Sequence, residues 1–157
     1  MAQHALPEIL VLCMDKEDIN ALNQALVTKW PTHARSLKIS SIHESMRSLP
    51  TDNHFDLIVS PANSYGILDG GFDDAISRTF CLPQHEYRAL TDASQRKLYD
   101  QWRGFAPPGS CTLVKMPAEL QRTNRWGCRH LALCPTMRGF PVSRHGTAKS
   151  STRPFGV

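Results

Sequence analysis

The sequence lacks the features that mark several common classes of protein. No stretch of its 157 residues approaches the ~18 consecutive apolar residues that a membrane-spanning helix needs. No basic region precedes the first apolar stretch, as one would in a secretory signal peptide. We therefore expect a protein of the cytoplasm or nucleus with no membrane partner.

The five cysteines include no C-x-x-C pair, which excludes the commonest zinc-ribbon and redox motifs. Cys13, Cys111 and Cys134 lie in apolar, strand-like stretches. Reduced, buried thiols are the favoured interpretation. A zinc site built from Cys128, His130 and Cys134 is the alternative, although its spacing matches no finger or ribbon. The sequence predicts no metal and no cofactor.

Positive charge is not spread along the chain. The formal net charge is +4, and the surplus cations all lie after residue 137, at Arg138, Arg144, Lys149 and Arg153. The remaining basic residues balance the 14 acidic ones. The short basic cluster around Trp126 has no repeat elsewhere and is interpreted as a charged surface loop. The sequence therefore carries no strong signal for nucleic-acid binding.

The most informative stretch is FDLIVSPANSYGILDGGFDDAI, residues 55–76. It begins with a short apolar run that is typical of a strand buried on both faces of a parallel sheet. The strand ends at Pro61, because proline cannot donate to the ladder. Asn63 and Ser64 follow at once. Open α/β sheets bind ligands just beyond the carboxyl ends of their strands, so these polar residues are candidate ligand contacts.

A glycine pair and a helix start complete the stretch. Gly70 and Gly71 allow the backbone to approach a ligand closely or to adopt positive φ. Phe72, Asp73 and Asp74 then begin a helix with acidic residues in its first turn. The unpaired N–H groups of a helix start suit a phosphate or diphosphate. The stretch therefore predicts a nucleotide-like cleft.

Apolar periodicity predicts the other elements. Strands are expected at residues 8–15, 37–42, 110–114 and 129–134, and helices at residues 16–29, 72–80 and 91–102. Asp15 is placed to cap the first helix. Alternating strands and helices predict one α/β domain over residues 1–141. Residues 142–157 have no apolar periodicity and are expected to form a disordered basic tail.

The order of residues in VSPANSYGILDGGFDDAI resembles the first ligand loop of macrodomains: a strand, an Asn-containing turn, a glycine run and an acid at the start of a helix. The run PPGSCTLVKMPAEL resembles a second part of that family, and PTMR resembles the short second ligand loop of a macrodomain-like group of fungal type. The resemblance covers roughly residues 8–141. It does not include the further helix, often with a strand, that covers one side of the sheet in members of the family. It implies a three-layer α-β-α fold with a mixed, mostly parallel central sheet.

The resemblance also implies a ligand, ADP-ribose or an ADP-ribosylated protein. Asn63 matches the residue near the distal ribose, Gly70 and Gly71 match the end of the glycine run, and Asp73 matches the acid that follows it. The implied ligand-binding residues are Ser60, Ala62, Asn63, Ser64, Gly70, Gly71, Phe72, Asp73, Thr136, Met137 and Arg138.

Two alternatives to simple binding stay open at the level of sequence. In a hydrolase of ADP-ribose esters or phosphoesters, Asp73 would act as the base and Asn63 would position the ribose. Ser60, however, stands where many hydrolytic members carry an additional asparagine. In a non-binding scaffold, Asn63 would only satisfy its own loop as an Asx turn. Asp73 and Asp74 would then serve as helix caps, and the glycines would form a tight turn.

Overall fold

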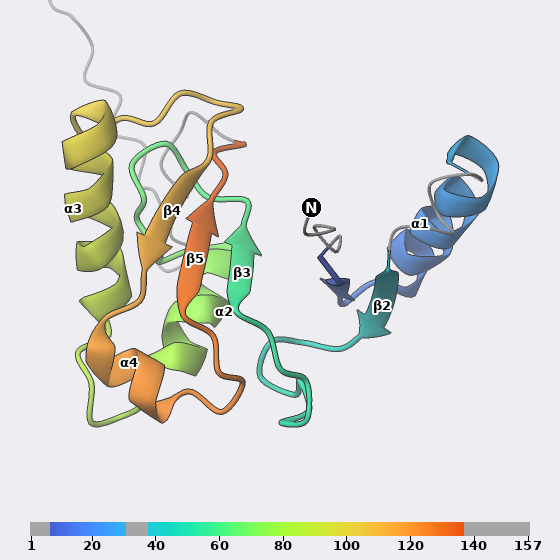
Figure 1. Cartoon of the computed structure of the whole chain (residues 1–157), viewed down its shortest axis with the longest axis horizontal. Helices are drawn as coiled ribbons and strands as arrows, with labels where there is room; N and C mark the ends of the chain where they lie inside the picture. Colours follow the sequence, from blue (N-terminus) through green and yellow to red (C-terminus); the bar gives the residue numbers. More distant parts are fainter. Residues whose placement is uncertain (1–6, 31–37, 137–157) are drawn as a thin grey trace, which may run out of the picture. The chain divides into compact units, whose positions relative to one another are not determined.

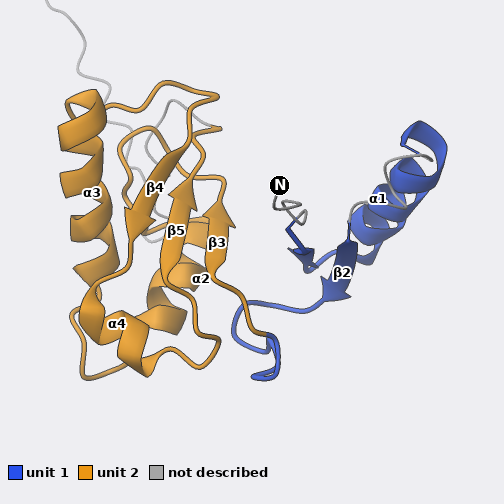
Figure 2. Ribbon diagram, viewed as in Figure 1, with its two compact units in different colours: residues 1–53 blue, residues 54–157 orange. Residues whose placement is uncertain are grey.

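The computed structural model describes residues 7–30 and 38–136 and shows a mixed α/β protein, which confirms the predicted class (Figure 1). In chain order the elements are β1 (Ile9–Cys13), α1 (Lys16–Lys29), β2 (Ile39–His43), β3 (Leu57–Ser60), α2 (Gly71–Phe80), α3 (Ala89–Trp102), β4 (Thr112–Lys115), α4 (Ala118–Thr123) and β5 (His130–Leu133). The chain divides into two compact units, residues 1–53 and 54–157 (Figure 2). The proposed extent of one domain, residues 1–141, stays a prediction, and the tail at 142–157 lies outside the described residues.

In the first unit, α1 connects two strands that pair in parallel. β1 and β2 are aligned from Ile9 opposite Ile39 onward. Parallel neighbours need a crossover connection, and α1 supplies it. The predicted N-cap is confirmed, because the side chain of Asp15 accepts a hydrogen bond from the main-chain N–H of Glu17 at 2.8 Å.

In the second unit, β5 lies between β3 and β4 in a mixed sheet. It is parallel to β3, with Leu133 opposite Ser60, and antiparallel to β4, with Leu133 opposite Thr112. Because β3 and β5 run in the same direction, their carboxyl ends lie at the same edge of the sheet (Figure 1). The loops that follow these two strands therefore begin side by side.

The sheet of the second unit has one buried face and one open face. Ile58 and Leu131 are neighbours across the ladder and are both buried. The residues that alternate with them on β3, Leu57 and Val59, expose 43% and 55% of their surface, and Leu113 on β4 exposes 51%. Within the second unit β3 is therefore covered on one face only, and its burial on both faces stays a prediction.

Both long helices of the second unit lie on the buried face. Trp102 of α3 donates from Nε1 to Oγ1 of Thr112 at 2.8 Å. Ser60 donates from its hydroxyl to the carboxylate of Asp73 on α2. Since Ser60 and Thr112 both sit opposite Leu133 on the buried side, the two helices cover the same face. The apolar run of β3 thus belongs to a strand covered on one side within this unit.

Trp126 lies in the core, although the basic cluster around it is predicted to be a surface loop. Only 1% of Trp126 is exposed. Its ring stacks on Phe55 at 5.9 Å and contacts Phe80 at 5.5 Å between ring centres. The guanidinium of Arg125 lies 4.5 Å from the centre of the indole, within the range of a cation–π contact. The loop is charged outside and aromatic inside.

Replacing leucine by alanine on opposite faces of the sheet tests which face is buried. Leu131→Ala removes a fully buried side chain, so it should lower the free energy of unfolding by about 2–5 kcal/mol. Leu113→Ala removes the same atoms from the open face and should cost roughly 1 kcal/mol or less. Urea unfolding followed by circular dichroism measures both, and equal losses would show that the second face is covered as well.

Candidate functional site

Main-chain hydrogen bonds continue the pairing of β3 and β5 into the segments that follow them. We call residues 61–70 the first loop and residues 134–136 the second loop. The N–H of Cys134 donates to the carbonyl of Ser60 at 2.9 Å, and the N–H of Thr136 donates to the carbonyl of Ala62 at 3.1 Å. The hydroxyl of Thr136 also donates to the carbonyl of Pro61 at 3.4 Å. The structure therefore brings together Ser60, Ala62 and Thr136 from the predicted site.

Two predicted contacts of the second loop, Met137 and Arg138, lie outside the described residues. Of the remaining predicted residues, Ser60, Ala62, Asn63, Ser64 and Asp73 are buried. The glycine pair and Phe72 form the start of α2.

Asn63 is buried inside the first loop and bonds to it. Its side-chain oxygen accepts from the N–H groups of Tyr65 at 3.0 Å and Ile67 at 3.3 Å. Its side-chain nitrogen donates to the carbonyl of Ile67 at 2.7 Å. Asn63 exposes only 1% of its surface. Its side chain therefore gives the loop its shape, as in the Asx-turn alternative raised by the sequence.

The first loop requires glycine at position 66, which was not among the residues predicted from the sequence. Its φ is +64°, in the left-handed region. A Cβ at this position would lie 2.6 Å from Cδ1 of Leu98 on α3, so no larger residue fits without displacing the helix side chain. A lone glycine between Tyr65 and Ile67 is the only signal in the sequence.

Buried side chains of α2 and α3 anchor the far end of the first loop. The hydroxyl of Thr91 accepts from the N–H of Leu68 at 3.1 Å, and the hydroxyl of Ser77 donates to the carbonyl of Leu68 at 2.8 Å. Nearer the sheet, the carbonyl of Ser64 accepts from the N–H of Ala106 at 2.9 Å. The loop is thus bonded at both ends to the scaffold.

The glycine pair forms an open start to α2. Gly70 is extended and occupies the N-cap position, and Gly71 has a φ of +58°. No side chain caps the helix, so the prediction that Asp73 or Asp74 acts as a cap is wrong, although both acids lie in its first turn. A Cβ at Gly71 would have no described atom of another segment within 4 Å. The first turn of α2 therefore has no side-chain cap, and the position that a Gly71 Cβ would take is clear of described atoms.

Asp73 is nearly buried beneath the open turn. Only 6% of its surface is exposed, and its carboxylate accepts a hydrogen bond from the hydroxyl of Ser60. Burial raises the pKa of Asp73 from 3.8 to about 6, against the opposing effect of the Ser60 bond, and the nearby charge of Asp69 raises it further. A carboxyl group with this pKa can exchange a proton near neutral pH.

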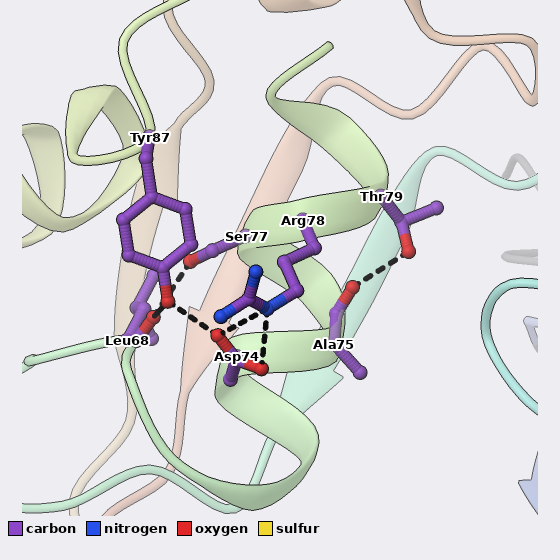
Figure 3. Close-up of polar contacts among 7 residues, drawn as sticks. All are labelled: Leu68, Asp74, Ala75, Ser77, Arg78, Thr79 and Tyr87. Atoms are coloured by element: carbon purple, nitrogen blue, oxygen red, sulfur yellow. Dashed lines mark hydrogen bonds and ion pairs between the residues drawn. The ribbon is translucent and has the colours of Figure 1, made fainter. Parts of the chain in front are cut away.

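Asp74 belongs to a cluster that joins α2 to the segment before α3 (Figure 3). Tyr87 donates to Oδ1 of Asp74 at 2.5 Å and to the carbonyl of Leu68 at 3.4 Å. Nε of Arg78 bonds to the same carboxylate at 2.7 and 2.9 Å, and its guanidinium lies 5.3 Å from the centre of the Tyr87 ring. Burial, followed by the bond to Asp74, raises the pKa of Tyr87 to about 12. This phenol therefore stays protonated and keeps donating.

The thiols are free but not all buried. Cys81 and Cys128 are buried, Cys13 and Cys134 are half-buried, and Cys111 is exposed, so the prediction of burial is wrong for Cys111. The Cys128 thiol contacts the carbonyl of His130 at 3.3 Å. Within residues 7–30 and 38–136, no group of three or more His, Cys, Asp or Glu side chains is arranged to hold a metal ion.

None of the helices in the described part of the chain is both long and apolar enough to cross a membrane. No known family model matches the chain, and no curated protein matches its sequence. The likeness to macrodomains thus rests on the residues quoted above.

Asp73→Asn should remove a pH dependence of stability. The folded-state pKa of Asp73 lies above its unfolded value, so its favourable contribution is complete below about pH 3.8 and is lost as the pH rises through about 6. The asparagine variant keeps an acceptor for Ser60 without the charge. Relative to wild type, its free energy of unfolding should therefore rise by up to roughly 3 kcal/mol between pH 4 and pH 7.

Urea unfolding at several pH values measures this difference. Asp100→Asn, which removes an exposed carboxylate of α3, is the control for the loss of one charge. A pH-independent difference for Asp73→Asn would show that Asp73 ionises without penalty in the folded protein.

Proposed function

We propose that this chain is a macrodomain-like module that binds ADP-ribose, or a protein carrying it, at the edge formed by the first and second loops. The proposal includes the three-layer α-β-α arrangement of that family and action in the cytoplasm or nucleus. The observation that carries it is the open, uncapped start of α2 at Gly70 and Gly71.

The start of α2 favours a diphosphate. The first N–H groups of a helix have no partner within it, and the helix dipole favours an anion there. No side chain caps this turn, and the space beside Gly71 is clear of described atoms. A diphosphate offers several acceptor oxygens and negative charge, so it matches both properties of this turn.

The two adjoining loops favour a ligand larger than a lone phosphate. Thr136 is bonded to both Pro61 and Ala62, so groups from the ends of β3 and β5 meet at one edge. Sugar hydroxyl groups on either side of a diphosphate would lie along this edge. In this arrangement Asn63 contributes by holding the first loop in shape, since its amide oxygen and nitrogen already bond to Tyr65 and Ile67.

A hydrolase of ADP-ribose esters or phosphoesters is the second candidate. The observation that favours it is the pKa of about 6 for Asp73, which suits a general base near neutral pH. Its burial and its bond to Ser60 favour a supporting role instead. Binding is therefore the main proposal.

Calorimetric titration with ADP-ribose tests binding, with AMP as the comparison ligand. Gly71→Ala places a methyl group in the space assigned to the diphosphate and should weaken binding at least about tenfold, or about 1.4 kcal/mol. Gly127→Ala is the matched control, because Gly127 also has positive φ and open surroundings but precedes β5, away from the loops. It should change the affinity less than about twofold, equivalent to roughly 0.4 kcal/mol.

Equal weakening in both glycine variants would attribute the effect to backbone strain. No heat and no thermal shift from folded wild-type protein would exclude both ligand-based functions and favour a scaffold. AMP binding as tight as ADP-ribose binding would contradict a role for the second phosphate and distal ribose.

Turnover of an ADP-ribosyl ester by wild type and Asp73→Asn separates the two candidates. If Asp73 is the base, the variant should bind ADP-ribose normally and lose at least about a hundredfold in rate. If the protein is a binding module, neither protein should hydrolyse the ester above the uncatalysed rate. Turnover that is unchanged in the variant would exclude Asp73 as the base.

A further inference from the structure

Two cysteines flank the last residue pair at one end of the antiparallel ladder of β4 and β5. Thr112 of β4 is opposite Leu133 of β5. In an antiparallel pair the next position outward joins the residue before Thr112 to the residue after Leu133. These residues are Cys111 and Cys134.

The hydrogen-bond pattern makes this a close pair. The N–H of Met116 donates to the carbonyl of Arg129 at 3.0 Å, which marks that pair as hydrogen-bonded. Bonded and non-bonded pairs alternate along the ladder, so Thr112 with Leu133 is a bonded pair. One step beyond it, the same register would make Cys111 and Cys134 a non-bonded pair. Consistently, the N–H of Cys134 donates away from β4, to Ser60. Facing residues of non-bonded pairs have Cα atoms roughly 4.5 Å apart, within the range that a disulfide bridges.

The two thiols differ in access from Cys81 and Cys128. Cys111 is exposed and Cys134 is half-buried, whereas Cys81 and Cys128 are buried. Burial raises the pKa of Cys128 to about 11, which suppresses its thiolate. Burial and then a hydrogen bond with Cys111 raise the pKa of Cys134. Cys111 is the exposed thiol of the two and is the one that an external reagent reaches first.

We propose that Cys111 and Cys134 form an oxidation site, which a low-molecular-weight disulfide such as oxidised glutathione closes into a reversible intramolecular bond. The Cys111 thiolate attacks one sulfur of the reagent, releases one glutathione thiolate and becomes a mixed disulfide. The Cys134 thiolate then attacks the Cys111 sulfur and releases the second glutathione thiolate. The released thiolates take up the protons that the cysteines lost, so the protein loses two electrons and two protons and the reagent becomes two thiols.

The bond would form at the base of the second loop. Cys134 begins that loop, and the carbonyl of Pro135 accepts from the N–H of Gly109 at 3.2 Å. A disulfide to Cys111 would add a covalent link to this hydrogen bond. The oxidation chemistry does not depend on the ligand proposed for the loops.

Reduced full-length protein treated with oxidised glutathione, followed by intact-mass measurement and peptide mapping, tests the site. Wild type should lose the mass of two hydrogens, with the link mapped to Cys111 and Cys134, and reduced glutathione should restore the original mass. Cys134→Ser should instead keep glutathione attached to Cys111. Cys13→Ser, which removes a half-buried thiol of the first unit, should behave as wild type.

Three results would overturn the proposal: an unchanged wild-type mass, a link that includes another cysteine, or a stable glutathione adduct on Cys111 of wild type. The wild-type map decides the question by itself if a serine variant fails to fold. Circular dichroism of each variant shows whether it has folded.

Discussion

The candidate site depends on one buried amide. The side chain of Asn63 bonds three times to the backbone of its own loop, and these bonds replace those that a strand or helix would have supplied. Without them, the N–H groups of Tyr65 and Ile67 would lose their acceptor inside a buried turn, at a cost of about 1–3 kcal/mol for each unsatisfied group. The placement of Gly70, Gly71 and the start of α2 follows from this turn, because they continue directly from it.

The same turn is also constrained from outside. Gly66 lies so close to Leu98 that a side chain at position 66 would collide with this residue of α3. The Tyr87 phenol bonds both to the loop carbonyl of Leu68 and to Asp74 on α2. A loop held by its own amide, by a helix side chain and by a phenol has few ways to rearrange, so its open turn is presented in a defined geometry. Such preorganisation lowers the entropy lost when a ligand binds.

Local chemistry made much of this architecture predictable from the sequence. Asp15 as a helix cap, Pro61 as a strand end and the Gly70–Gly71 helix start each depend on residues close together in the chain. The unpredicted features depend on distant partners. Trp126 is buried because Phe55 and Phe80 meet it, and β3 is covered on one face because α2 and α3 lie on the same side. Periodicity reports how apolar a run is but not what covers each face.

The pairing of β3 with β5 sets the order in which the site can be assembled. Thr136 and Pro61, whose contact joins the two loops, are 75 positions apart in the chain. Bringing such distant segments together has an entropic cost, and proteins rich in non-local contacts fold slowly. A chain still emerging from the ribosome would expose the first loop before β5 had been made. The site is therefore expected to be a late product of folding, absent from any intermediate in which β5 has not yet docked.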